Sequence, residues 1–456
     1  MAQTGKVTFR GIRRGKTRRW MMEGGVLASA LASGGVLAAA CSGSERAGTA
    51  PNPSQGPVTL VVNTIDARRE GPIYEEIYRA AEARRPGLKT DLVVAGPEKV
   101  IAMASAGTPM DVVRVSGSRD FTSFACKGLI LPVDEYLKRG DYPVKDAMPI
   151  AMQGVEWRGK HYGITFNLGA NVVYFNKTLF ERKAAKLPTE YQRDRRWTWE
   201  AFQEAARSVS GGTGTDQTWG LDRITCLCQV NALIYTAGGE MYDKEMRVSR
   251  FDHPQTVEAL QFLTDLMLRH RATPSLPERK ELGKDPLLLG RGGMRYTARF
   301  DARPIDEAAQ HDGWQPGMVL PATGPSGKVV TRESPVSMAI GQGTKHPEDA
   351  WLVVRTWGDA VGQKLYVGNG LGLPVLKTMW DQPFVKETLF PWEDLATYKR
   401  SVELAYIQVP PVYPEVASVF NRELDLMQSG QKSVKDGMTT LKREADSLLA
   451  SVSCSA

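Results

Sequence analysis

The stretch VTLVVNTIDARREGPIYEEIYRAAEARRPGLKTDLVV, residues 58–94, decides the fold. Its first five residues are apolar or β-branched, which favours a strand. Residues 71–85 repeat apolar side chains at helical spacing, and Pro86 ends that predicted helix. Residues 89–94 predict a second strand. Strand, helix and strand in this order are typical of an α/β protein.

The same alternation continues along the chain. Residues 99–106 predict a short helix and residues 111–115 a third strand, so we expect a mostly parallel sheet. Apolar stripes predict further helices at 256–270 and 347–357. The folded body begins near Val58, and its roughly 400 residues are enough for about two domains.

The first 40 residues predict an export signal peptide. They carry seven Lys or Arg residues, followed by a weakly apolar run rich in Gly and Ala. Residues 17–22, TRRWMM, resemble a twin-arginine export motif, with the general secretory route as the alternative. A membrane span needs about 20 apolar residues, and this run is shorter and rich in glycine. We therefore expect cleavage before Cys41.

The sequence around Cys41 indicates a membrane anchor. Residues 37–41, LAAAC, resemble a bacterial lipobox, in which the cysteine of the new N-terminus receives the lipid. Residues 41–56 are rich in Ser, Gly, Pro and Thr and predict a lipidated flexible tether. The predicted location is extracytoplasmic, lipid-anchored to the cell membrane, in a periplasm or on the outer face of the cytoplasmic membrane.

The net charge does not indicate a nucleic-acid partner. The formal charge is +7, but residues 1–40 hold seven basic residues against Glu23 alone, a surplus of +6. The mature chain therefore carries about +1 and lacks the basic footprint of a nucleic-acid binder.

Four cysteines remain after Cys41. They are Cys126, Cys226, Cys228 and Cys454. Four are too few for a disulfide-built scaffold, and bridging Cys226 to Cys228 would close a short ring. We expect buried free thiols.

Signatures of catalysis and of resident cofactors are weak or absent in the sequence. It holds no Gly-x-Ser-x-Gly motif, and its five histidines never fall at the close spacing of two metal ligands on one helix. The glycine-rich residues 368–372 do not lead from a strand into a long helix, which disfavours a dinucleotide site. Neither a cofactor nor a metal is expected. Paired carboxylates for glycoside cleavage stay open, because 51 acidic residues allow many combinations.

The sequence HYGITFNLGANVVYFNKTLF, residues 161–180, resembles extracellular solute-binding proteins of family 1, the maltose-binding-protein-like receptors of ABC transporters. Further pieces match in the family's order: WTWEAF at 197–202, YTAGGE at 235–240, the helix 256–270, KHPEDAW at 345–351 and GLGLP at 370–374. The resemblance covers nearly all of the mature chain.

The resemblance implies a two-lobed periplasmic-binding-protein type II-like fold with two discontinuous lobes joined by crossing strands. The implied lobes are residues 57–170 with 297–337, and residues 171–296 with 338–456. The implied crossings lie near 171–175, 293–297 and 337–340. The expected partners are a carbohydrate ligand, ABC permease subunits and the membrane through the lipid, and we expect a monomer.

Carbohydrate sites combine aromatic faces with carboxylate, amide and guanidinium groups. Such residue types near the implied crossings and at strand ends give the candidate substrate-binding set Asp66, Arg119, Asp120, Phe166, Asn167, Gln229, Asn231, Tyr296, Arg299, Phe300, Asn369, Gly370 and Leu371. Helix capping, surface ion pairing, core packing and simple turns are the structural alternatives for these residues.

The resulting hypothesis is a non-catalytic receptor that captures a mono- or oligosaccharide between two lobes and delivers it to a permease. A receptor for a charged solute such as a glycerol phosphodiester is the first alternative, with Arg119, Arg295 and Arg299 as candidate anion-binding groups. A surface-anchored glycan-cleaving enzyme is the second.

Overall fold

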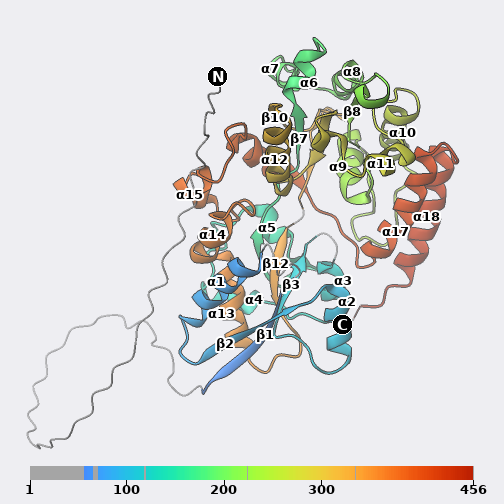
Figure 1. Ribbon diagram of the computed structural model, residues 1–456. Helices are drawn as coiled ribbons and strands as arrows, with labels where there is room; N and C mark the ends of the chain where they lie inside the picture. The colour runs from blue at the N-terminus through green and yellow to red at the C-terminus, as the bar shows by residue number, and fades with distance from the viewer. Residues whose placement is uncertain (1–55, 65–69, 118–119, 223, 334, 455–456) are drawn as a thin grey trace, which may run out of the picture. The chain divides into compact units, whose positions relative to one another are not determined.

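The computed structural model describes residues 56–64, 70–117, 120–222, 224–333 and 335–454. The predicted signal peptide, Cys41, Asp66 and Arg119 lie outside these residues. The described body contains a five-stranded and a four-stranded sheet (Figure 1). We call the parts built on these sheets the first lobe and the second lobe. Within the described ranges, no helix is both long enough and apolar enough to span a membrane.

The sheet of the first lobe has the strand order β2-β1-β3-β12-β6. Its strands are β1 (Val58–Thr64), β2 (Leu88–Val94), β3 (Val112–Ser116), β6 (Ile164–Asn167) and β12 (Val336–Ile340). β1 pairs in parallel with β2 and β3, whereas β12 runs antiparallel to β3 and β6. Four strands, β1, β2, β3 and β6, therefore run in one direction, as expected for a mostly parallel sheet, and β12, which enters from the second lobe, runs in the opposite direction between β3 and β6.

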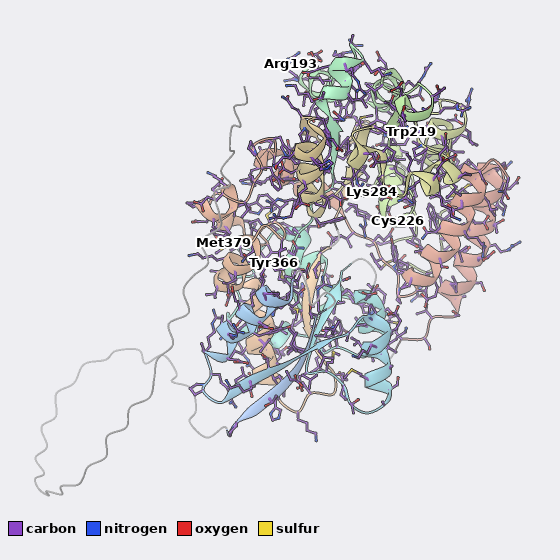
Figure 2. All side chains as sticks on the ribbon, in the orientation of Figure 1. Arg193, Trp219, Cys226, Lys284, Tyr366 and Met379 are labelled. Carbon is purple, nitrogen blue, oxygen red and sulfur yellow. A yellow bond between two sulfur atoms is a disulfide. The ribbon has the colours of Figure 1, made fainter. Side chains whose placement is uncertain are left out.

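Short helices and one hairpin complete the first lobe. They are α1 (Gly71–Glu82), α2 (Pro97–Ser105), α3 (Phe121–Cys126), α4 (Asp134–Lys138), α5 (Pro149–Gln153), α13 (Pro347–Gly358), α14 (Ala360–Val367), α15 (Pro383–Lys386) and the hairpin β4 (Glu156–Trp157) and β5 (Lys160–His161). Figure 2 shows Tyr366 in this lobe, on α14, and its ring centroid lies 5.0 Å from that of Phe166. Trp357 lies 4.6 Å from Phe166 and 4.4 Å from Tyr74. These aromatic rings form the centre of the first-lobe core.

The sheet of the second lobe has the strand order β10-β7-β9-β8. Its strands are β7 (Val172–Asn176), β8 (Trp219–Leu221), β9 (Gly292–Thr297) and β10 (Pro316–Val319). Its helices are α6 (Lys177–Arg182), α7 (Pro188–Arg193), α8 (Trp199–Ser208), α9 (Leu227–Ala237), α10 (Pro254–Leu268), α11 (Leu276–Leu282), α12 (Ala302–Asp312), α16 (Leu395–Glu403), α17 (Tyr413–Gln428) and α18 (Val434–Ala450). Apolar faces of α8, α9, α10, α17 and α18 share one large core with this sheet.

The elements with strong local signals match their predictions. The strand predicted at 58–62 is β1, the helix predicted at 71–85 is α1, and the helices predicted at 256–270 and 347–357 are α10 and α13. The helix predicted at 99–106 is α2, shifted by about half a turn.

The predicted lobe boundaries are wrong for two segments. Residues 297–337 were expected in the first lobe, yet β10 pairs with β7 of the second sheet. Residues 338–456 were expected in the second lobe, yet α13 and α14 pack against α1 and β6 of the first lobe. The chain crosses between β6 and β7, between β10 and β12, and between α14 and α16. The expected crossing at 293–297 is therefore absent, because β9 continues into α12 of the same lobe.

The expectation of free thiols is also wrong. Cys126 bonds to Cys454, and Cys226 bonds to Cys228. The backbone at Cys226 is extended just before α9 begins, and the two Cα atoms of this second pair are 5.1 Å apart. That separation lies within the range that a disulfide requires.

Candidate functional site

A cavity of about 970 Å³ lies between segments of the two lobes. Its lining residues are, from the first lobe, Gly117, Phe121, Thr122, Gln153, Gly154, Glu156, Trp157, Arg158 and Gly159, and, from the rest of the chain, Lys244, Glu245, Met246, Arg247, Tyr406, Ile407, Gln408, Val409, Pro411, Leu449, Ala450, Val452 and Cys454. A solute bound there would contact both lobes at once.

The first-lobe wall is a tight hairpin. Arg158 and Gly159 both have positive φ, 50° and 75°, between the paired strands β4 and β5. Positive φ at both loop residues is the signature of a type I′ turn, whose twist matches that of the strands. The turn holds the Arg158 guanidinium 5.3 Å from the centroid of the Trp157 ring. The Trp157 ring is 8% exposed and packs in a first-lobe core cluster, so the Arg158 guanidinium lies beside a largely buried ring at the edge of the cavity.

The second-lobe wall centres on Tyr406. This residue lies on β13 (Ala405–Tyr406), which pairs in parallel with β11 (Thr331–Arg332). The Tyr406 side chain lies against Tyr235, with ring centroids 4.4 Å apart, and the residue is 38% exposed. Burial raises the pKa of Tyr406. Its hydroxyl therefore stays protonated near neutral pH and can donate a hydrogen bond to a solute.

Gln408 joins the cavity wall to the loop that carries the second-lobe charges. Its Oε1 accepts a hydrogen bond from the Tyr235 hydroxyl, and its Nε2 donates to the Asp243 carbonyl at 3.0 Å. The Asp243 carboxylate in turn accepts from the backbone N–H groups of Arg247 and Val248. This network fixes residues 243–248, from which Lys244, Glu245 and Arg247 reach the cavity.

Two crossing segments are held side by side by a buried carboxylate. Glu333 is 1% exposed and accepts hydrogen bonds from the backbone N–H groups of Gly169 and Ala170, at 2.6 and 3.0 Å. Asn171 donates through its side chain to the Arg332 carbonyl. These hydrogen bonds link the crossing after β6 to the crossing before β12, and we call this region the hinge.

The sequence-predicted residues do not gather in one place. Phe166 is fully buried among the aromatic rings of the first-lobe core and exposes no face. Phe300 is 62% exposed and Asp120 is buried next to the cavity-lining Phe121, but neither lines the cavity. Asn369 donates to the Leu365 carbonyl within its own turn.

Four of the predicted residues lie on or beside the 369–372 loop instead. A Cβ placed on Gly372 would lie 1.7 Å from the Asn167 Oδ1, so the 369–372 loop closes directly onto Asn167. Gly370 has a φ of +73°, which this turn requires. Leu371 packs against the first-lobe core. The Arg299 guanidinium donates to the Gly372 carbonyl at 2.6 Å and contacts Glu393 at 3.3 Å.

The remaining predicted residues lie within the second lobe. Gln229 donates to the Tyr296 carbonyl at 3.4 Å, so these two predicted residues are in contact. Tyr296 is 8% exposed, and burial raises its pKa. Asn231 is also buried, and its Oδ1 accepts from the Ala232 N–H.

A buried charge cluster in the second lobe is organised by Arg295. Its guanidinium contacts the carboxylates of Asp285, Asp301 and Asp222 at 2.7, 3.0 and 3.3 Å. Burial is the largest cause that raises the pKa of Asp222, to about 7, and the neighbouring Asp285 charge adds to it. Arg295 is thus fully engaged by carboxylates and is not available to an external anion.

The raised pKa of Asp222 predicts a stability that falls with pH. The folded state holds this proton more tightly than the unfolded state, whose pKa is near 4. The contribution is therefore complete below pH 4 and declines as the pH rises to about 7. We expect Asp222→Asn to lose less stability than the wild type between pH 5 and pH 8. Urea denaturation at both pH values measures this, and equal losses in the two proteins would contradict it.

Most residues that line the cavity carry no signal in the sequence. For Trp157 and Arg158 the usable signal was the neighbouring Gly159, since a glycine between short segments favours a turn. Tyr406 and Gln408 follow an ordinary helix, and no sequence signal marks either of them. Among the described residues, no cluster of His, Cys, Asp and Glu is suited to a metal ion.

The sequence matches one protein family and several binding proteins. The family model for bacterial extracellular solute-binding proteins matches residues 67–364. A binding protein of Brucella abortus (strain 2308) is 23% identical over 405 residues, covering 86% of this chain and 93% of that protein. The arabinooligosaccharide-binding protein of Halalkalibacterium halodurans is 23% identical over 351 residues, covering 71% and 73%.

Solved structures share the fold. An ABC substrate-binding protein from Listeria monocytogenes in complex with cycloalternan superposes with a TM-score of 0.75 at 16% identity, covering 86% of this chain and 99% of that one. UgpB from Mycobacterium tuberculosis in complex with glycerophosphocholine gives 0.71 at 15% identity, covering 87% and 99%.

Proposed function

Because the chain belongs to the bacterial extracellular solute-binding protein family, we propose that it is the substrate-binding receptor of an ATP-binding-cassette importer for a carbohydrate. The observation that carries this proposal is the cavity lined by both lobes, with Trp157 and Tyr406 among polar and charged side chains. Such a cavity can close on a solute, exclude water and present a changed surface to permease subunits.

The chemistry of the lining favours a sugar. Aromatic faces stack on the C–H side of a sugar ring, and hydroxyl, carboxylate and guanidinium groups bond its hydroxyls. Tyr406, which is 38% exposed, supplies the first kind of contact, and Glu156, Arg158 and Glu245 supply the second. A volume of about 970 Å³ lies at the upper end of the roughly 300–1,000 Å³ typical of small-molecule sites. We infer an oligosaccharide, in line with the cycloalternan and arabinooligosaccharide proteins that this chain resembles.

The setting follows from the N-terminal sequence. Export through the signal peptide at residues 1–40, by the twin-arginine route, and lipid attachment at Cys41 would keep the receptor at the outer face of a membrane. The receptor acts without catalysis and as a monomer.

One observation favours a charged solute as the second candidate. Arg158, Lys244 and Arg247 line the cavity against two acidic residues, and UgpB, of the same fold, is bound to a phosphodiester. Arg295 and Arg299, two of the three arginines that the sequence suggested for an anion, are engaged by buried carboxylates. A charged solute would therefore have to use the hairpin and the 244–247 loop.

A thermal-shift screen tests the function, because a ligand that binds only the folded state raises the unfolding midpoint. The panel comprises maltotetraose, a cyclic α-glucan, arabino-oligosaccharides and glycerophosphocholine. We expect at least one neutral saccharide to raise the midpoint and to remain chemically intact. Stabilisation by glycerophosphocholine alone would select the charged-solute receptor, and the appearance of shorter saccharides would indicate an enzyme.

A further inference from the structure

The disulfide between Cys126 and Cys454 joins the two lobes. Cys126 is the last residue of α3 in the first lobe, and Cys454 follows the end of α18 by four positions. The two cysteines are 328 positions apart in sequence. Helix α18 packs against α17 and α10 of the second lobe. The bond is therefore a covalent link between lobes that are otherwise connected by the crossing segments.

In the first lobe, the disulfide is anchored in a buried core cluster. Cys126 is 3% exposed in a core cluster with Phe121 and Phe124. Val452 and Cys454 pack against the same cluster. The last residues of the chain thus leave the second lobe and lie on the first.

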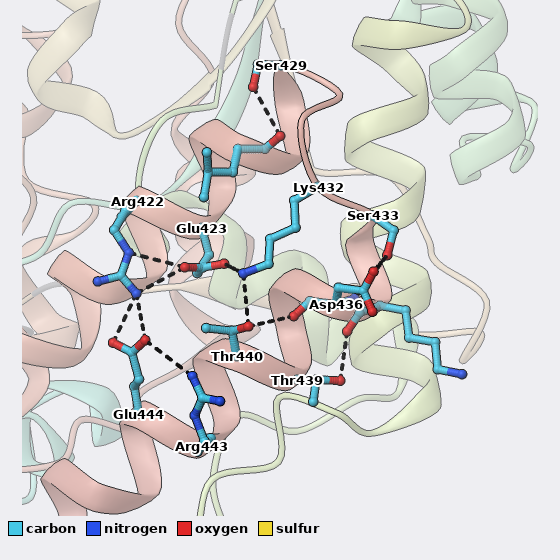
Figure 3. Close-up of polar contacts among 12 residues, drawn as sticks. Arg422, Glu423, Ser429, Lys432, Ser433, Asp436, Thr439, Thr440, Arg443 and Glu444 are labelled. Atoms are coloured by element: carbon cyan, nitrogen blue, oxygen red, sulfur yellow. Dashed lines mark hydrogen bonds and ion pairs between the residues drawn. The ribbon is translucent and has the colours of Figure 1, made fainter.

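In the second lobe, the disulfide is anchored through α18, which is held against α17. Figure 3 shows the polar contacts that hold α18 against α17. Arg422 bridges Glu423 and Glu444 at 3.0 and 2.9 Å, and Lys432 contacts Glu423 at 2.6 Å. Lys432 also donates to the Thr440 hydroxyl at 2.9 Å. Because both helices are fixed together, a pull on Cys454 acts on the whole lobe rather than unravelling its last helix.

The length of the link limits how far the lobes can separate on this side. Four residues from Ala450 to Cys454 span at most about 14 Å when extended. The two bonded Cα atoms add 4.5 Å. Among the described residues, the contacts on this side also include the Thr122 hydroxyl to the Pro410 carbonyl at 3.2 Å and the packing of Met246 against both lobes. Those contacts are weak and can break when the lobes open.

We propose that the Cys126–Cys454 disulfide is a redox-sensitive strap that limits opening of the cavity and slows release of the bound solute. Cys454, Val452 and Leu449 line that cavity, so the strap forms part of its wall. Two equivalents of a thiol reductant would cleave the bond, giving two protein thiols and one reductant disulfide. That the disulfide limits opening follows from the fold alone. That it slows release of a solute rests on the proposed function.

The test compares two double variants with the wild type. Cys126→Ala/Cys454→Ala removes the strap, and Cys226→Ala/Cys228→Ala removes the disulfide that lies within the second lobe. Small-angle scattering of the ligand-free proteins should give a larger radius of gyration for the first variant only. Wild type treated with dithiothreitol and then alkylated should behave like the first variant, which guards against a variant that fails to fold.

Release is measured by stopped flow with whichever saccharide the thermal-shift screen identifies. Because affinity changes within one site fall mainly on dissociation, we expect the strap-free variant to release it at least about tenfold faster. An unchanged radius of gyration would overturn the strap, whether or not any saccharide binds. A larger radius with unchanged release would overturn its effect on the solute. If no saccharide in the screen binds, the proposed function is contradicted. The scattering result alone then tests whether the disulfide limits opening.

Discussion

Replacement of Arg299 by Met is expected to lower the free energy of unfolding by about 3–5 kcal/mol, because it leaves a buried carboxylate without its counter-charge. The Glu393 side chain is 0% exposed and lies 3.3 Å from the Arg299 guanidinium. Arg299 also donates to the Gly372 and Thr388 carbonyls, at 2.6 and 3.0 Å. The substitution would therefore leave the Glu393 carboxylate and two backbone carbonyls without their partner.

The control for this prediction is Arg193→Met. Arg193 lies at the outer end of the second lobe (Figure 2) and its side chain is 72% exposed. Its loss should change stability by less than about 0.5 kcal/mol. Urea denaturation measures both variants. If Arg299→Met kept its stability but lost saccharide binding, Arg299 would be a ligand-contacting residue, as the sequence suggested, rather than a hinge residue.

Replacement of Tyr406 by Ala is expected to weaken saccharide binding by about tenfold to a hundredfold, or roughly 1.5–3 kcal/mol. Tyr406 is the most exposed aromatic residue among those described in the cavity wall, and β13 and Tyr235 hold its ring in place. A sugar stacked on the ring would lose that contact entirely. Tyr406→Phe retains the ring and should lose less affinity than Tyr406→Ala.

Phe300→Ala is the matched control, since Phe300 is 62% exposed and does not line the cavity. Its affinity should equal that of the wild type in calorimetric titration. Strong loss of binding in Phe300→Ala with normal binding in Tyr406→Ala would place the ligand elsewhere on the protein. The thermal midpoint of each unliganded variant shows whether the fold is retained.

The sequence was sufficient for elements whose signals are local. Strand β1 and helix α1 follow from a β-branched run and a helical repeat closed by proline, and neither depends on distant residues. The lobe boundaries depend on which strands pair. β10 pairs with β7 across more than a hundred residues, and no local pattern marks that choice.

The candidate site was harder to predict for the same reason. Phe166 and Asn167 lie where the resemblance places a crossing. The Phe166 side chain is buried in the core, however, and Gly372 packs directly against the Asn167 side chain. Trp157 and Tyr406 face one cavity although they are far apart in the chain. The Cys126–Cys454 bond joins residues that carry no sequence signal for each other. Only the folded chain brings these groups together.

Hydrogen exchange with and without the stabilising saccharide tests the central claim most directly, namely that one solute is held by both lobes in this cavity. The account predicts slower exchange in both walls at once, in the first-lobe hairpin at residues 153–161 and in the second-lobe segment at residues 405–411. Protection confined to one lobe, or found only at residues outside the cavity such as 187–193, would contradict it.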